Sequence, residues 1–233
     1  QRRDQFDHLV IETTGLADPA PVIQTFFVDE DMKDKIQLDA VVTVIDAKHI
    51  EQHWDADEAQ EQIAFADIIL LNKIDLVDSE ELNQLEKKLR EINRMAKIYQ
   101  TKDTEIAMNY LLGVQAFNLN YALEIDPNFL SEDAHEHDNS VYSVAFVESG
   151  QLDMEKVSNW ISNLLRTQGQ DIFRLKGILN IAGMNERLVL QGVHMLLNAK
   201  PDRPWKPEEI RRNELVFIGR NLDEMQLKEE LKA

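Results

Sequence analysis

The tetrapeptide Asn72-Lys73-Ile74-Asp75 directly follows the apolar run IILL. The carboxylate of Asp75 can accept two hydrogen bonds from guanine, one from the ring N–H and one from the exocyclic amine, whereas adenine has no donor at the corresponding ring nitrogen. Asn72 can brace the loop and reach the base edge, and the methylenes of Lys73 can lie over the purine face. Because four-residue patterns also arise by chance, the guanine site is a hypothesis that the preceding apolar run favours.

A second polar segment also follows an apolar run. In the stretch HLVIETTGLADP, residues 8–19, three apolar residues run directly into Glu12, Thr13, Thr14 and Gly15. A site for Mg²⁺ and a triphosphate needs an acidic residue at a strand end to hold the water shell of the ion, and a backbone amide that senses the γ-phosphate. Glu12 and Gly15 fit these roles, since glycine lets the backbone approach phosphate closely, and the two threonines offer hydroxyls to water or ligand. The alternative is a plain strand and turn, with ADPAP starting the next helix.

Three continuous apolar runs predict buried strands in the first half of the chain. They are LVI before Glu12, AVVTVI before Asp46 and IILL before Asn72. Continuous rather than alternating runs are typical of strands that are covered on both faces, as in a parallel sheet. Ligands of such sheets bind at the carboxyl ends of the strands, where these three polar residues fall. The simpler interpretation is that polar residues merely end the strands.

Residues 79–95 carry the clearest helical pattern. Its apolar residues recur at intervals of three and four, at Leu82, Leu85, Leu89 and Ile92. Asp78 followed by Glu81 predicts a capping box at the start of this helix, with Asp in place of Ser or Thr. Because strands and helices alternate, the fold class predicted for this part is doubly wound α/β.

The second part of the chain, from about Ser140, predicts an α+β domain. SVYSVAFVE reads as an alternating strand, and MEKVSNWISNLL as a helix with one apolar face made by Val157, Ile161 and Leu164. FRLKGILNIAG and RLVLQGVHMLL are predicted to pair around a turn at Gly183–Asn185, LVFIG adds a strand, and a last helix carries Leu227 and Leu231. We assign the apolar residues, and also His194 and Trp205, to core packing.

Composition narrows the class of protein. The 233 residues are 43% apolar and can bury a sizeable core. No run approaches the ~18 to 20 apolar residues of a membrane span, and QRRDQFDH has no signal-peptide core, so a cytoplasmic protein is expected. The sequence has no cysteine, which excludes disulfides and thiolate metal ligands within these residues.

Charge divides the chain into two parts. The net charge is -18, and it lies entirely in residues 1–138, which hold 30 acidic and 12 basic residues. An acidic chain of this kind argues against nucleic-acid and anionic-membrane partners. The charge step predicts a domain boundary near residues 120–140, which gives a first domain over residues 1–120, a linker over 121–139 and a second domain over 140–233.

Histidines crowd into the predicted linker, in the stretch SEDAHEHDNS. His135 and His137 would point to one side of an extended chain, and Glu136 or Asp138 could complete part of a tetrahedral zinc site. A solvated acidic loop explains the same composition, so both interpretations stay open.

Taken together, ETTGLADP, NKIDLV and LVFIGRNLD occur in an order that resembles the CobW-like P-loop GTPases, a family that includes zinc metallochaperones and proteins tied to cobalamin biosynthesis. The resemblance covers nearly the whole chain. It implies that Glu12 is the Walker B acid associated with Mg²⁺ and that Gly15 is the glycine of the second switch. It also implies a carboxy-terminal domain of the CobW type, with a surface for a client protein.

The sequence departs from the family at its beginning. The family starts with a strand, a phosphate-binding loop of the GxxGxGKT type and a Cys-x-Cys-Cys metal motif, whereas here residue 1 is Gln and no glycine is followed by lysine. We therefore expect these elements to lie upstream of Gln1, and the fragment alone to be inactive.

The resemblance implies a GTP-hydrolysing metallochaperone that uses GTP and Mg²⁺ and delivers a transition metal, zinc or else cobalt, to a client metalloprotein. The alternative is a non-catalytic binding or regulatory paralogue that keeps the fold without a phosphate loop. A Gly-rich loop ending in Lys-Thr or Lys-Ser in the upstream sequence would favour the enzyme.

Overall fold

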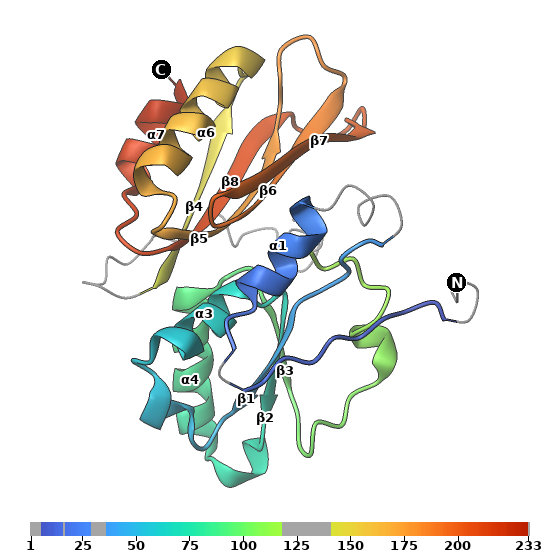
Figure 1. Cartoon of the computed structure of the whole chain (residues 1–233), viewed down its shortest axis with the longest axis vertical. Helices are drawn as coiled ribbons and strands as arrows, with labels where there is room; N and C mark the ends of the chain where they lie inside the picture. The colour runs from blue at the N-terminus through green and yellow to red at the C-terminus, as the bar shows by residue number, and fades with distance from the viewer. Residues whose placement is uncertain (1–5, 16, 29–35, 118–140, 233) are drawn as a thin grey trace.

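The computed structural model describes residues 6–15, 17–28, 36–117 and 141–232. These residues form a three-stranded parallel sheet and a five-stranded antiparallel sheet, which pack against each other through helices and loops (Figure 1). The described helices include none that is long and apolar enough to cross a membrane. The predicted linker, residues 121–139, falls wholly outside the described residues.

The parallel sheet has the strand order β1-β2-β3. Its strands are β1 (Val42–Asp46), β2 (Ile68–Asn72) and β3 (Lys97–Gln100). Every residue of β2 is buried, because β2 pairs on both edges, with β1 and β3. The predicted strands before Asp46 and Asn72 are confirmed, and each includes the polar residue at its end. Helices α3 (Asp57–Phe65) and α4 (Ser79–Ile92) connect the three strands.

Helix α4 begins as the sequence predicts. The Asp78 carboxylate accepts hydrogen bonds from the backbone N–H groups of Glu80 and Glu81, and the Glu81 carboxylate accepts one from Asp78 N, so the capping box is confirmed. The helix ends at Ile92, three residues earlier than predicted. Asn93 ends it, because its buried amide donates to carbonyls at the end of α3 and its oxygen accepts from Met95 N and Ala96 N.

The predicted strand LVI before Glu12 is wrong. Residues 9–11 form no strand, and the side chains of Leu9, Val10 and Ile11 are exposed. In the described part of the chain β1 pairs only with β2, and Val42 and Val44 on β1 are also exposed. An extended segment gains neither ladder hydrogen bonds nor apolar burial unless a strand lies beside it, so its composition alone does not make it a strand.

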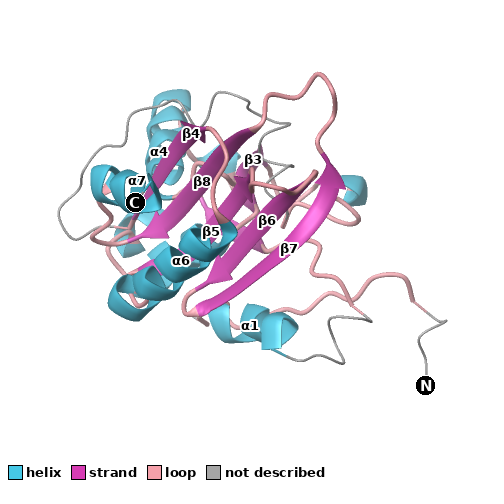
Figure 2. Ribbon diagram, turned by 90° about the horizontal axis from the view of Figure 1, so that it is seen from above, coloured by secondary structure: helices cyan, strands magenta, loops and turns pink. Residues whose placement is uncertain are grey.

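The antiparallel sheet has the order β4-β8-β5-β6-β7. Its strands are β4 (Tyr142–Ser149), β5 (Ile172–Leu179), β6 (Glu186–Val193), β7 (Leu196–Pro204) and β8 (Arg212–Gly219). Helices α6 (Met154–Gln168) and α7 (Glu224–Lys232) cover one face of this sheet (Figure 2). The predicted helices, the β5–β6 pair and the strand LVFIG are confirmed.

One predicted strand of this sheet is in fact two. The run RLVLQGVHMLL turns at His194 and Met195, so that Val193 in β6 pairs with Leu196 in β7. His194 adopts a positive φ of 50°, and its N–H donates to Phe173 O at 3.0 Å. The turn lacks the Gly or Asn that usually marks such a hairpin, which is why the pattern hid it.

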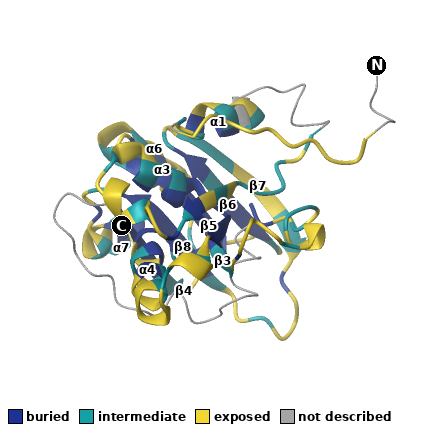
Figure 3. Cartoon of the chain, turned by 90° about the horizontal axis from the view of Figure 1, so that it is seen from below, coloured by how far each residue is buried: buried dark blue, intermediate teal, exposed yellow. Residues whose placement is uncertain are grey.

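The second face of the antiparallel sheet lies against the parallel part. One buried apolar cluster takes members from both sheets, among them Ile63 and Leu89 from the first part and Val216 and Ile218 from β8. Figure 3 shows that the buried residues gather on the strands at the centre of the view, with exposed residues on the helices and loops around them. His194 and Trp205 both take part in packing, as predicted: the half-buried His194 ring contacts the rings of Phe65 and Phe173, and Trp205 is 8% exposed.

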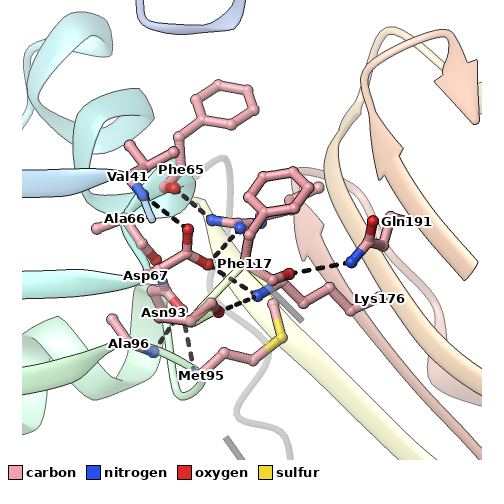
Figure 4. A network of polar contacts seen from close by, with 12 residues as sticks. Val41, Phe65, Ala66, Asp67, Asn93, Met95, Ala96, Phe117, Lys176 and Gln191 are labelled. Atoms are coloured by element: carbon pink, nitrogen blue, oxygen red, sulfur yellow. Dashed lines mark hydrogen bonds and ion pairs between the residues drawn. The ribbon is translucent and has the colours of Figure 1, made fainter. Parts of the chain in front are cut away.

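Three buried charged residues join the two parts (Figure 4). Asp67, just before β2, accepts hydrogen bonds from Arg174 and from Lys176, whose Nζ lies 2.8 Å from Asp67 Oδ1. Asp67 Oδ2 also accepts from Val41 N at 2.8 Å. Lys176 donates in addition to Ala116 O at 3.1 Å. Because these ionised groups are buried, their mutual pairing is what makes the contact tolerable.

Candidate functional site

The carboxyl ends of β1 and β2 bring two polar residues together, because Asp46 and Asn72 are register partners in the parallel ladder. Lys73 follows in a left-handed conformation with φ of 62°, and its Nζ lies 2.7 Å from Asp46 Oδ2. The turn therefore directs Lys73 back across the end of β1. The predicted residues Asn72 and Lys73 thus lie at the edge where parallel sheets bind ligands.

Asp46 accepts several hydrogen bonds. Lys48 N and His49 N donate to Oδ1 at 3.0 and 3.2 Å, and His49 Nδ1 lies 3.0 Å from Oδ2. Burial on its own would raise the pKa of Asp46, but the hydrogen bonds from Lys73 and His49 outweigh it and hold the pKa well below the ordinary value. Asp46 is therefore ionised and fixes Lys73 electrostatically. Its place at this edge was expected from the sequence, but its role there was not.

Asn72 ties β2 to the loop that follows β3. Its Oδ1 accepts hydrogen bonds from Thr101 Oγ1 at 3.2 Å and from Thr104 N at 2.9 Å. Thr104 and its neighbour Asp103 both have positive φ values, 56° and 52°, which side-chain-bearing residues adopt only when their surroundings hold them there. Sequence patterns did not indicate Thr101 and Thr104, because their part in the site depends on a contact across 29 and 32 residues.

Asp75 lies in the short helix η3 (Ile74–Leu76), beyond the end of β2. Its side chain is 39% exposed, and Lys102 Nζ lies 3.7 Å from Oδ2. This carboxylate faces solvent at the same edge as Asn72 and Lys73. It is open to donors from a ligand, as the guanine hypothesis requires.

The segment from Glu12 to Gly15 makes its contacts elsewhere. Glu12, Thr13 and Thr14 are exposed, and a Cβ atom added at Gly15 would meet no atom within 4 Å. Gln62 in α3 donates its side-chain N–H groups to Gly15 O and to Ala17 O, both at 3.0 Å. Gly15 is thus hydrogen-bonded to α3, whereas Asn72 is hydrogen-bonded to the loop after β3.

A hollow of about 330 Å³ lies beside β1. Asp46, His49 and Gln62 are among the residues that line it. The residue that fixes Lys73 and the residue that holds Gly15 therefore border the same space.

The predicted transition-metal ligands fall in a segment that the structure does not describe. His135, Glu136, His137 and Asp138 lie outside the described residues, and across the parts of the chain that are described no three His, Asp or Glu side chains are placed to hold a metal ion. Glu12 and the hydroxyls of Thr13 and Thr14 supply oxygen donors, which is the donor chemistry that Mg²⁺ prefers. Their exposure leaves them open to the ion's water shell.

The parallel sheet with polar residues at its carboxyl ends, followed by an antiparallel sheet with two helices on one face, defines a nucleotide-binding α/β protein with an appended α+β domain. Residues 1–100 match the family described as CobW/HypB/UreG, nucleotide-binding domain. Residues 141–233 match the cobalamin synthesis protein cobW C-terminal domain. The chain belongs to the CobW family.

Individual relatives agree with this assignment. The zinc chaperone YjiA of Escherichia coli is 35% identical over 96% of this chain and 70% of its own. The zinc-regulated GTPase metalloprotein activator 1 of Schizosaccharomyces pombe is 31% identical over 95% of this chain and 62% of its own. The zinc chaperone CobW of Pseudomonas aeruginosa is 30% identical over the whole chain and 68% of its own.

The crystal structure of Zn(II)-bound YjiA GTPase from E. coli superimposes with a TM-score of 0.81 at 34% identity. The match covers 98% of this chain and 71% of that chain. The described fold is therefore that of the solved relative over nearly all of these residues.

Proposed function

We propose that this chain is part of a GTP-hydrolysing metallochaperone, which binds GTP with Mg²⁺ and delivers zinc to a client metalloprotein. The relatives named as zinc chaperones and as a GTPase metalloprotein activator support the class. The observation that carries the proposal in the structure is the loop Asn72–Asp75 at the carboxyl end of β2, which Asp46 and Thr104 hold in place. Cobalt is the alternative cargo, since the same N and O donors serve both metals.

In this proposal Asp75 reads guanine by accepting two hydrogen bonds, Asn72 braces the loop, and Lys73 lies along the base. Glu12 holds the water shell of Mg²⁺, and Gly15 N–H senses the γ-phosphate. Mg²⁺ would neutralise the charge that develops on the transferred phosphoryl group. The hydroxyl groups of Thr13 and Thr14 donate hydrogen bonds to water or phosphate beside Glu12.

Phosphate binding sets a limit on what residues 1–233 do alone. Their sequence contains no glycine followed by lysine, whereas P-loop proteins enclose the β- and γ-phosphates with backbone amides and a lysine. We infer that hydrolysis requires such a loop in addition to these residues. The proposed organisation is a nucleotide-binding part over 1–120, a linker over 121–139 and a client-binding domain over 140–233.

Base recognition is tested by Asp75→Asn in a chimera that places the phosphate-loop segment of YjiA before residue 1. An asparagine amide donates where the carboxylate accepts, so GTP binding should weaken by roughly 1–3 kcal/mol for each donor left unpaired, and xanthosine triphosphate should bind better. Asp78→Asn is the matched control, because asparagine also caps helices. Equal GTP affinity in the chimera with Asp75→Asn and in the unaltered chimera would show that Asp75 does not bind the base.

Cargo binding is tested at the histidines. If His135 and His137 ligate zinc together with Asp138, the double variant His135→Ala, His137→Ala should lose one equivalent of zinc at neutral pH. Binding to the unaltered chain should also fade below pH ~6.5, where imidazoles protonate. The measurement is zinc stoichiometry by metal analysis after dialysis, and equal stoichiometry in both proteins would leave this segment as an ordinary acidic loop.

A further inference from the structure

Among the described residues, the side chain of Gln62 holds the turn that contains Gly15 from outside. Ala17 N donates to Thr14 O at 3.0 Å, which closes the turn, and the Gln62 amide donates to the carbonyls of Gly15 and Ala17. Both carbonyls are thus fixed to α3 by the same nitrogen. The orientation of the Gly15 peptide therefore depends on Gln62.

Helix α1 (Ala20–Val28) starts directly after this turn. Asp18 Oδ1 accepts a hydrogen bond from Ala20 N at 2.8 Å, which caps the first turn of the helix. The helix then contacts β6 and β7 of the antiparallel sheet (Figures 1 and 2). Ile23 is 3% exposed and belongs to the same buried cluster as Val193 in β6. The segment from Gly15 to α1 thus ends on the C-terminal domain.

The β6–β7 turn is itself packed against α3. The His194 ring lies 5.3 Å from the Phe65 ring and 5.4 Å from the Phe173 ring, measured between centroids. Burial lowers the pKa of His194, and the nearby charge of Asp18 acts in the opposite direction. Asp18 is therefore close enough to His194 to influence it, although the two residues lie in different parts of the chain. Helix α3, the Gly15 turn and the β6–β7 turn form one contiguous contact.

We propose that Gln62 is a positioning residue for the Gly15 turn, and that α1 carries the position of this turn to the β6–β7 hairpin of the C-terminal domain. The proposal rests on the proposed function, in which Gly15 senses the γ-phosphate. It adds the route by which the nucleotide state reaches the domain that faces the client. A displacement of Gly15 must break its hydrogen bond with Gln62 unless α3 moves with it, and a displacement that includes Ala17 also moves the start of α1, which contacts β6 and β7.

Hydrogen exchange on residues 1–233 without nucleotide tests the route, using Gln62→Ala and, as control, Gln60→Ala. Gln60 lies on the same helix, but its amide donates to Trp54 O and does not reach the turn. In Gln62→Ala, exchange at Ala17 N–H should rise about tenfold, and exchange at His194 N–H, which donates to Phe173 O, should rise severalfold. In Gln60→Ala both amides should exchange as in the parent.

Coupling between two sites is reciprocal, so a change where α1 packs on the β6–β7 hairpin must also alter hydrogen exchange in the Gly15 turn. Ile23→Ala loosens the packing of α1 on the hairpin and should raise exchange at Ala17 N–H, although Ile23 and Gln62 belong to different helices. A rise at Ala17 in Gln62→Ala with no change at His194 would overturn the route. Equal rises in Gln60→Ala would overturn it too, because general loosening of α3 would then be the cause. No nucleotide is present, so either failure leaves the proposed GTP site untouched.

Discussion

The two sheets differ most in how completely they are closed. Every residue of β5 in the antiparallel sheet is buried, since β5 pairs with β6 and β8 and has α6 and α7 on one face and the parallel part on the other. The antiparallel sheet is open along β7, where no residue is buried, but β4, β6 and β8 are mostly buried. In the parallel sheet β2 is fully buried, whereas its neighbours β1 and β3 are mostly not, and Val44 on β1 is 56% exposed. The part that carries the candidate chemistry is thus the less closed of the two.

This difference separates stability from function along the chain. Apolar burial near β5 contributes the usual stabilisation of about 25 cal/mol per Å² of apolar surface removed from water. At the carboxyl edge of β1 and β2, polar side chains are held by hydrogen bonds and remain accessible, as with Asp75. Substitutions in the first region should therefore change unfolding, and those in the second should change ligand binding.

The largest effect on this comparison is expected at the contact that joins the two regions. Asp67→Asn leaves Arg174 and Lys176 buried without their anion, which should lower the free energy of unfolding by roughly 3–5 kcal/mol. Urea denaturation measures the change. Asp57→Asn is the control, since Asp57 pairs with Arg220 at an exposed position and its loss should cost below about 1 kcal/mol. Similar midpoints for the two variants would mean that the buried cluster does not hold the parts together.

Two valines sharpen the contrast between the sheets. Val144 in β4 is 1% exposed, so Val144→Ala should destabilise the protein by about 2 kcal/mol through lost burial and a small cavity. Val44→Ala on the exposed face of β1 should stay within about 0.5 kcal/mol. Thermal and urea unfolding of both variants provide the comparison. A larger loss for Val44→Ala would show that β1 is covered in solution.

A pH-dependent change in stability is also expected from the contact that joins the two regions. Burial lowers the pKa of Lys176 to about 8, with the charge of Arg174 acting in the same direction and that of Asp67 opposing it. Between pH 8 and about 10.5 the folded state therefore binds fewer protons than the unfolded state, so the free energy of unfolding should rise with pH, by at most ~1.4 kcal/mol per pH unit. Lys176→Met should lack this rise. Parallel profiles for parent and variant would contradict the lowered pKa.

Local patterns predicted much of the fold, because periodicity reports burial. The capping box at Asp78 and the apolar face of α6 are local features, and both were confirmed. The failures concern pairing: LVI before Glu12 has a strand's composition but no strand beside it, and the turn at His194 lacks the usual turn residues. A pattern of residue types shows that a segment can be a strand, but it does not show which segment pairs with it.

The candidate site was predictable where its residues are contiguous or end a predicted strand. Asn72, Lys73 and Asp75 share one loop, so the spacing indicated them, and Asp46 was expected at the same edge because it ends a strand. The contacts of Asp46 with Lys73 and of Thr104 with Asn72 were not predicted, because no spacing connects these residues. Arg174 and Lys176 lie within the run FRLKGILNIAG, and nothing local distinguishes a buried cation in a strand from one that faces solvent.

Isothermal titration of residues 1–233 with GTP and Mg²⁺ tests most directly the proposal that these residues read the base and bind Mg²⁺ but do not enclose the phosphates. Asp75 is assigned to base reading and Glu12 to Mg²⁺ binding, but the sequence holds no glycine followed by lysine, the pattern of a loop that encloses the phosphates. We therefore expect residues 1–233 to show no measurable GTPase activity and at best millimolar GTP binding. We expect the chimera with a phosphate loop to hydrolyse GTP and to bind it more tightly. Micromolar binding by residues 1–233 alone would contradict this assignment, and would mean that the turn from Thr13 to Gly15 already binds phosphate.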